Sequence, residues 1–178
     1  MAKGKLEQAI EFAVMAHAGD YRDGDLPLPY VSHAIEVMSL LRYVGGVTDE
    51  DLLVIACLHD VLEETQYSAA SIEGVFGNRV ASGVVNLTRY EPSALERGEL
   101  TEQQVWELRS SILLGEISQM PEEIQAIKLA DRLANIRQAK VTRKPKKLAR
   151  YKRQTEEILR LIPSSVNPTL WQAVFDEL

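Results

Sequence analysis

The sequence predicts an all-α fold, a compact helical bundle, and three observations support this. Apolar residues recur at three- and four-residue spacing along most of the chain, which is the period of an amphipathic helix. Glycines, prolines and capping residues divide the chain into segments of ordinary helix length. We find neither a repeat nor the apolar–polar alternation of a half-buried strand. The 178 residues, 46% of them hydrophobic, suffice for one domain over residues 1–178.

A polar loop separates the first two expected helices. An apolar stripe over residues 6–18 predicts the first helix. Residues 19–29 are rich in Gly, Asp and Pro and predict the loop. Ser32 can cap the second helix, which Gly45-Gly46 ends.

Three more helices are expected before residue 90. Thr48–Asp51 resembles a capping sequence, with an acidic residue three positions after the threonine. It opens an apolar helix that we expect to continue to about Thr65. Ser68–Phe76 is a shorter helix that Gly77 stops, and Asn78–Thr88 is the next.

The C-terminal half contains a long loop and four helices. Arg89–Leu100 is polar, with a proline and a glycine, and predicts a loop. Thr101–Ser118 is the first helix, and Pro121 suits the first position of the second. Lys146–Leu161 and Pro168–Glu177 complete the chain.

Charge limits the classes of partner. The formal net charge of −6 disfavours general nucleic-acid binding, which depends on neutralising phosphates. The segment from Arg137 to Arg153 is a basic exception. It is either a solvated loop and helix face or a rim that attracts a polyanionic small molecule.

Neither a targeting segment nor a membrane span is evident. The N-terminus lacks an apolar signal core, and no apolar run approaches the roughly 20 residues that a membrane span needs. Cys57 is the one cysteine, so the chain forms no internal disulfide, as in a reducing compartment. We therefore expect a cytoplasmic protein in which Cys57 is a small buried hydrophobe.

The pair His59-Asp60 is the strongest functional signal. It follows the apolar run Leu52–Leu58, where an uncompensated carboxylate would cost several kcal/mol. His33 stands near a helix start, and Asp131 lies in the apolar helix after Pro121. Two histidines and two aspartates make a plausible site for a divalent metal. By itself, His33 would be interpreted as a capping or satisfied histidine.

Consecutive helical residues point about 100° apart. His59 and Asp60 can therefore share an ion only in a crevice between helices, which His33 and Asp131 could close. Glu63 and Glu64 follow one turn after the pair and could orient or deprotonate a water molecule. They could equally be exposed acids at a helix end.

Three further polar residues have open interpretations. Asn135 follows Asp131 by four positions and could contact a substrate hydroxyl or phosphate, or lie on a helix surface. Arg22 lies in the first loop and could reach a phosphate or remain in solvent. His17 ends the first helix, and we expect a structural role for it.

Several ordered motifs resemble those of one family. The chain is similar, over roughly residues 6–161, to the HD-domain hydrolases of the RelA/SpoT type. These enzymes remove the 3′-pyrophosphate from guanosine tetra- and pentaphosphate (ppGpp and pppGpp). The matching segments are Ala16–Arg22, Pro29–His33, Leu58–Thr65, Val85–Thr88 and Lys128–Arg137.

The resemblance implies specific roles. The ligands of one divalent ion, usually manganese in the family, would be His33, His59, Asp60 and Asp131. An acidic pair, Glu63 and Glu64, would handle the attacking water. The nucleotide would be contacted by Arg22, Asn135, Lys147 and Tyr151. The chain leaves no room for a synthetase domain and is similar in layout to the metazoan SpoT homologues.

Three departures keep other functions open. The family usually has Glu-Asp where this chain has Glu63-Glu64, a proline where it has Ala34, and often a basic residue where it has Asp23. The alternatives are an HD-domain phosphohydrolase acting on another nucleotide, for example an NADPH phosphatase, and a nucleotide-binding regulatory module with weakened catalysis. The sequence does not predict the oligomeric state.

Overall fold

The helical architecture that the sequence predicts is confirmed. The computed structural model describes residues 3–25, 27–98 and 100–178. Within these ranges there are eleven helices and one isolated antiparallel bridge, between Tyr21 and Pro29, but no strand. The helices are α1 (Lys5–Ala16), α2 (Val31–Tyr43), α3 (Glu50–Leu58), α4 (Val61–Glu64), α5 (Ala69–Phe76), α6 (Asn78–Leu87), α7 (Ala94–Arg97), α8 (Glu102–Gln119), α9 (Glu122–Thr142), α10 (Pro145–Leu161) and α11 (Pro168–Phe175).

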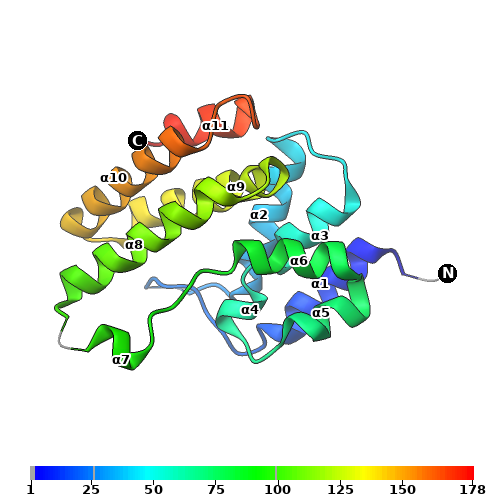
Figure 1. The fold of residues 1–178 in the computed structure, drawn as a ribbon. Helices are drawn as coiled ribbons and strands as arrows, with labels where there is room; N and C mark the ends of the chain where they lie inside the picture. Colours follow the sequence, from blue (N-terminus) through cyan, green and yellow to red (C-terminus); the bar gives the residue numbers. More distant parts are fainter. Residues whose placement is uncertain (1–2, 26, 99) are drawn as a thin grey trace.

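The long helix α9 joins two groups of helices (Figure 1). It packs against α2, α3 and α6 from the N-terminal half and against α10 and α11 from the C-terminal end. Helix α8 packs against α10, while α1 and α2 cover α3. Helix α9 is thus the element through which both halves of the chain can contribute to one site.

Helix α3 is buried all round because its sequence is apolar on every face, and the central turns of α9 are buried although they carry polar and charged residues. Each residue from Leu52 to Leu58 is buried, and α9 is buried without interruption from Ile124 to Ala134. A helix that is apolar all round must lie in a core rather than on a surface. In α9, the neighbouring apolar residues place Lys128, Asp131 and Arg132 in the interior.

Two capping predictions were wrong by one or two residues. Helix α2 begins at Val31, before Ser32, and Tyr30 at its N-cap makes no side-chain cap. Helix α3 is capped by Asp49 rather than by Thr48, since the Asp49 carboxylate accepts a hydrogen bond from the Leu52 amide at 3.2 Å. Aspartate is at least as good a cap as threonine, so the helix starts one residue later without a loss in capping.

Two further differences concern continuity. The helix expected to run to Thr65 stops at Leu58, and a separate turn of helix, α4, begins after Asp60. The loop expected over residues 89–100 contains α7, which a reciprocal capping box between Ser93 and Glu96 stabilises. Among the described residues, no helix combines the length and hydropathy that crossing a membrane would require.

Substitution of Gly83 tests the contact between α3 and α6. A Cβ at this position would lie 2.9 Å from Cγ1 of Ile55, a side chain that is only 1% exposed. We expect Gly83→Ala to lower the free energy of unfolding by about 1–3 kcal/mol through overpacking. Gly74→Ala is the control, because nothing lies within 4 Å of its added Cβ. It should add roughly 0.5–1 kcal/mol through helix propensity. Equal changes in urea denaturation would contradict the close packing.

Candidate metal centre and active-site pocket

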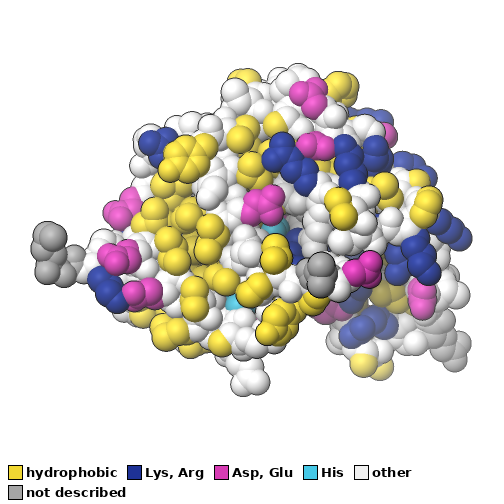
Figure 2. Space-filling view, turned by 180° about the vertical axis from the view of Figure 1, so that it is seen from behind, with side chains coloured by type: hydrophobic (Ala, Val, Ile, Leu, Met, Phe, Trp, Pro, Cys, Tyr) yellow, Lys and Arg dark blue, Asp and Glu magenta, His cyan; other side chains and the backbone are white. Residues whose placement is uncertain are grey.

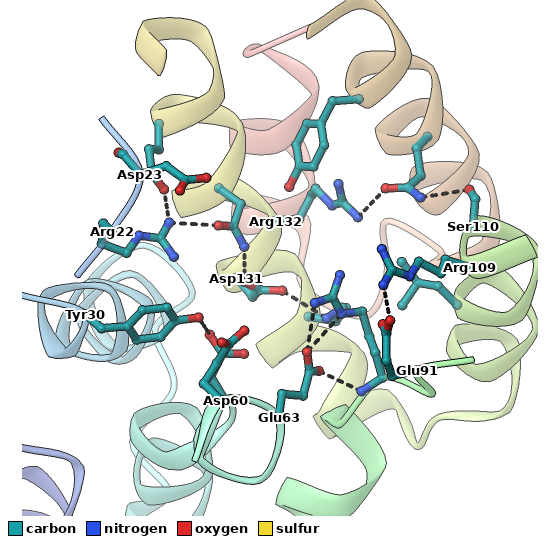
Figure 3. A pocket seen from close by; sticks show the side chains of 18 of the residues that line it. Arg22, Asp23, Tyr30, Asp60, Glu63, Glu91, Arg109, Ser110, Asp131 and Arg132 are labelled. Carbon is teal, nitrogen blue, oxygen red and sulfur yellow. Dashed lines mark hydrogen bonds and ion pairs between the residues drawn. The ribbon is translucent and has the colours of Figure 1, made fainter. Parts of the chain in front are cut away.

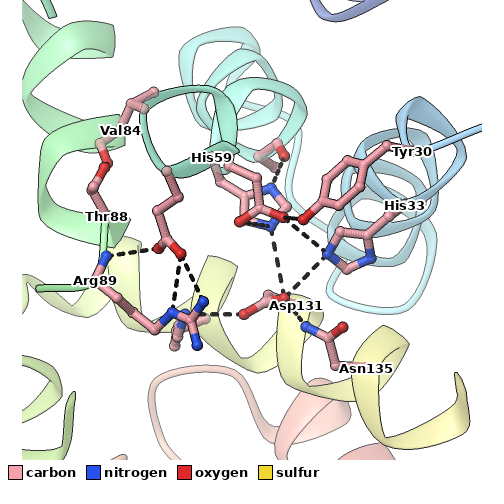
Figure 4. Close-up of polar contacts among 12 residues, drawn as sticks. Tyr30, His33, His59, Val84, Thr88, Arg89, Asp131 and Asn135 are labelled. Carbon is pink, nitrogen blue, oxygen red and sulfur yellow. Dashed lines mark hydrogen bonds and ion pairs between the residues drawn. The ribbon is translucent and has the colours of Figure 1, made fainter. Parts of the chain in front are cut away.

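Four side chains from three parts of the chain meet at one point (Figure 4). One ligand atom each from His33, His59 and Asp60 lie within 4.8 Å of one another. Oδ1 of Asp131 lies 3.4 Å from Nε2 of His33 and 3.6 Å from Nε2 of His59. Nε2 of His59 is also 3.2 Å from Oδ1 of Asp60. The structure therefore brings together all four residues that the sequence nominates as metal ligands.

The break between α3 and α4 makes this convergence possible. His59 is the C-cap of α3, and Asp60 is the N-cap of α4. Asp60 has φ −96° and ψ −4°, which lies between helical and bridge geometry. The two side chains leave the junction toward the same point, so the crevice that consecutive ligands require is the junction itself.

Several ring nitrogens of the cluster are buried without a hydrogen-bond partner. Both ring nitrogens of His33 and Nε2 of His59 are in this position, although the two residues are only 2% and 1% exposed. Nδ1 of His59 lies 2.9 Å from the Ala56 carbonyl, which favours a proton on Nδ1 and leaves Nε2 as the nitrogen that can lose its proton to bind a metal. Orphaned imidazole nitrogens beside carboxylates are the donor set that a divalent transition metal fits.

The electrostatics of the cluster favour added positive charge. Burial alone would raise the pKa of the Asp60 carboxyl, but His59 beside it holds that pKa well below its usual range. Burial is likewise outweighed at Asp131, where Lys128 and the two histidines lower the pKa. Against burial, Asp60 and Asp131 raise the pKa of His59 to about 10. The carboxylates thus stay ionised and attract a cation.

A second ring of polar contacts holds the carboxylates. The Tyr30 hydroxyl donates to Oδ2 of Asp60 at 2.8 Å, and Nδ2 of Asn135 donates to Oδ1 of Asp131. Arg22 donates from Nη2 to Oδ1 of Asn135 at 3.0 Å. Arg22 and Asn135 therefore lie next to the cluster, bonded to each other. Their proposed contacts with a nucleotide remain a prediction.

His17 lies behind this ring. It is 3% exposed and stacks on Tyr30 with ring centroids 4.7 Å apart. Burial, with the neighbouring histidines, lowers its pKa against the attraction of Asp60 and Asp20. Its position supporting Tyr30 agrees with the structural role expected from the sequence.

The acidic pair divides into two different environments. Glu63 receives the Arg89 amide at 2.7 Å and the Arg89 guanidinium at 3.0 and 2.9 Å, so both of its oxygens are engaged. Glu64 is exposed at the pocket wall. Partial burial, together with the charges of Asp60 and Glu63, raises its pKa. Sequence spacing treats the two glutamates alike, whereas the fold engages Glu63 and leaves the Glu64 carboxylate without a hydrogen-bond partner among the described residues.

The cluster opens into a pocket of about 560 Å³ (Figure 3). Arg22, Asn135, Glu63, Glu64 and Tyr151 line it, as the sequence suggests. Lys147 is exposed on α10 and is not among the described lining residues. Figure 2 shows Lys and Arg side chains gathered over the part of the molecule that α8 and α10 form. In the basic segment 137–153, Arg137 and Lys140 pair with Glu177, and Arg143 reaches the pocket.

Sequence reasoning missed several residues of this site. Lys128 pairs with Oδ2 of Asp131 at 3.0 Å, and its spacing of three residues on a helix was a usable signal. Tyr30 precedes His33 by three residues and offered a similar signal. Arg89 and Arg132 gave none, because their roles depend on contacts between distant segments.

Comparison with known proteins agrees with this geometry. A family model described as an HD domain matches residues 9–161. The chain belongs to the HD-domain family. HD-domain hydrolases use divalent metal ions, and the His/Asp cluster is the candidate site in this member.

Relatives of this HD-domain chain carry related names. A probable guanosine-3′,5′-bis(diphosphate) 3′-pyrophosphohydrolase of Synechocystis is 36% identical over 153 residues, which are 85% of this chain and 19% of that protein. The 3′-pyrophosphohydrolase MESH1 of Drosophila melanogaster is 31% identical over 137 residues, 77% of this chain and 70% of that protein. This chain thus spans about a fifth of the first relative and over two thirds of the second.

A solved structure shares the HD-domain fold. The metazoan SpoT orthologue described as hydrolysing ppGpp superposes with a TM-score of 0.85. The match covers 99% of this chain and 95% of that one at 24% sequence identity. At this identity the likeness establishes the fold.

Glu63→Gln tests the anchoring of Arg89. We expect the free energy of unfolding to fall by about 1 kcal/mol, because a nearly buried carboxylate that accepts three hydrogen bonds loses its charge. Glu91→Gln is the matched control, since Glu91 pairs with Arg109 on the surface, where ion pairs contribute little. Equal shifts of the two variants in chemical denaturation would show that Glu63 is not an anchor.

Proposed function

We propose that the protein is a metal-dependent phosphohydrolase that removes the 3′-pyrophosphate of ppGpp and pppGpp. The observation that carries the proposal is the cluster of His33, His59, Asp60 and Asp131, whose orphaned nitrogens and ionised carboxylates open into a pocket that several arginines also line. The names of the relatives from Synechocystis and Drosophila supply the substrate. The reaction yields GDP or GTP and pyrophosphate.

In this proposal the four clustered residues are the protein ligands of one divalent ion, most simply Mn²⁺. Imidazole and carboxylate donors together suit Mn²⁺ and several other divalent metals, so the ligand set narrows the choice to a class. When bound, the ion supplies Lewis-acid polarisation of a phosphoryl oxygen and lowers the pKa of a water molecule. Tyr30 and Asn135 orient the carboxylates through the hydrogen bonds described above.

Glu64 is the proposed general base. Its carboxylate lies in the pocket wall, and no hydrogen bond occupies it among the described residues. It accepts the proton of the water that attacks the 3′-linked phosphorus, while the bond from that phosphorus to the 3′ oxygen breaks and the released oxygen takes up a proton to become the 3′ hydroxyl. A raised pKa brings a carboxylate closer to the range in which it transfers protons efficiently. Glu63 holds Arg89 at the same wall.

The rest of the pocket provides the proposed nucleotide contacts. Arg22 and Asn135 stand beside the ligands, and Tyr151 lies further along the wall. Lys147, exposed on α10, would contact the substrate only from the rim. Arg22, Arg132 and Arg143 line the pocket without a carboxylate partner among the described residues, and their charges attract a highly anionic nucleotide in spite of the acidic total charge.

The direct test is hydrolysis of ppGpp by the purified protein with Mn²⁺, followed by chromatography of GDP and pyrophosphate. We expect metal-dependent release of both products. Asp60→Ala should abolish it, because this variant removes a ligand and the partner of Tyr30. Intact ppGpp in the presence of bound Mn²⁺ would refute the proposal.

A parallel assay with NADPH separates the proposal from its alternatives. Phosphate release from NADPH, without turnover of ppGpp, would make the protein a phosphatase of a different nucleotide. Binding of nucleotide and metal without turnover of either would make it a regulatory module.

The pair of variants Glu64→Gln and Glu64→Asp tests the general base. Removal of the carboxylate in Glu64→Gln should lower kcat by about 10²- to 10⁴-fold with little change in KM. Glu64→Asp retains the carboxylate and should keep at least about a tenth of the activity. Steady-state kinetics measure both effects. A normal kcat in Glu64→Gln would show that Glu64 is not the general base.

A further inference from the structure

Arg132 presents a buried charge that the metal cluster does not explain. It follows Asp131 on α9 and is only 4% exposed. Nη2 donates to Oε1 of Gln154 at 3.1 Å, while Nε and Nη1 are buried without a hydrogen-bond partner. No carboxylate of the described residues lies within ion-pair distance of it. A buried cation without a counter-charge is unfavourable unless a ligand supplies that charge.

Polar and aromatic side chains surround Arg132 and form one wall of the pocket. Gln154 extends the hydrogen-bond chain from Arg132 to α8, since its Nε2 donates to Oγ of Ser110 at 2.8 Å. The guanidinium carbon lies 4.4 Å from the centroid of the Tyr151 ring, and that of Arg143 lies 4.5 Å from the same centroid. All five residues line the pocket. Two guanidinium groups thus share one aromatic ring at the pocket wall, which concentrates positive charge there.

The pairing of the other pocket cations makes this wall distinctive. Arg89 pairs with Glu63, Arg109 with Glu91, and Lys128 with Asp131. Among the described pocket-lining residues, the remaining cations are Arg22, Arg132 and Arg143, none of which has a carboxylate partner. Of these three, Arg132 is the buried one.

This wall faces the metal cluster from a different side of the pocket. Side chains of consecutive helical residues diverge by about 100°. Asp131 points to the histidines of α2 and α3, whereas Arg132 points to α8 and α10. Figure 3 shows Arg132 and Ser110 across the pocket from Tyr30 and Asp60. A ligand bridging the two walls needs two separated anionic groups.

We propose that Arg132, held by Gln154 and Ser110 and flanked by Tyr151, is a second anion subsite that binds the 5′-phosphate chain of the nucleotide. The assignment to the 5′ chain rests on the proposed function, which places the 3′ chain at the metal cluster. The subsite selects nucleotides that are phosphorylated at both ends. A guanidinium whose Nε and Nη1 have no protein acceptor can donate charge-assisted hydrogen bonds to a phosphate.

Calorimetric titration of the metal-loaded full chain with GDP, and separately with guanosine, tests the subsite without turnover. We expect Arg132→Met to weaken GDP binding by about 10- to 100-fold and to leave guanosine binding unchanged. Arg153→Met is the matched control, an exposed arginine of α10 outside the lining residues, and should bind GDP as the wild type does. Unchanged GDP affinity in Arg132→Met, or no GDP binding by the wild type, would overturn the proposal.

Thermal stability separates a binding role from a structural one. Removal of a buried unpaired charge should leave the Tm of unliganded Arg132→Met equal to or above that of the wild type. A lowered Tm with unchanged GDP affinity would make Arg132 structural. If Arg132→Met does not fold, Arg132→Lys is the second variant. It keeps the positive charge but loses the planar guanidinium, so it should weaken GDP binding several-fold. Normal GDP affinity in that variant would also overturn the subsite.

Kinetics with ppGpp distinguish this proposal from the proposed function. An active wild type whose KM is unchanged by Arg132→Met would keep the hydrolase and reject the subsite. An inactive wild type that binds GDP through Arg132 would reject the hydrolase and keep the subsite. Both proposals hold if the wild type hydrolyses ppGpp and Arg132→Met raises its KM by about tenfold or more, with kcat nearly unchanged.

Discussion

The structure depends on the burial of ionised carboxylates where α2, the α3–α4 junction and α9 meet. Asp131 lies in the buried central part of α9, and Asp60 follows the apolar helix α3. Neither position is stable without compensation, and the compensation comes from residues scattered over the chain: two histidines, Lys128, Tyr30 and Asn135. The packing of α9 against the N-terminal helices therefore satisfies an electrostatic demand as well as a hydrophobic one.

The pocket combines paired and unpaired charges in a way that the total charge conceals. The chain is acidic, with a formal net charge of −6. Its pocket cations fall into those fixed by carboxylates and those held by neutral partners such as Gln154, Asn135 and Tyr151. Neutral partners fix the direction of a guanidinium and leave its charge available. The unpaired guanidinium groups therefore keep positive charge available at the pocket wall of an acidic chain.

Most of the fold and the cluster could be predicted from the sequence, because both follow from local patterns. Helical periodicity located the long helices, and acids within apolar runs identified Asp60 and Asp131. The interruption after Leu58 could not be predicted, since neither glycine nor proline marks it and the pull of the cluster on His59 and Asp60 is a tertiary effect. The different environments of Glu63 and Glu64 depend on Arg89, and the surroundings of Arg132 depend on α8 and α10, which no local pattern reveals.

The short bridge between Tyr21 and Pro29 places Arg22, beside the pocket, next to Tyr30, which holds the metal cluster. The Arg22 amide donates to the Leu28 carbonyl, and the Tyr30 amide to the Asp20 carbonyl, each at 2.9 Å. Arg22 also lies over the Tyr30 ring at 5.4 Å. A nucleotide bound by Arg22 and an ion held beside Tyr30 would stabilise the same loop conformation. In that case the two affinities would be thermodynamically linked, and each ligand would strengthen binding of the other by an equal factor.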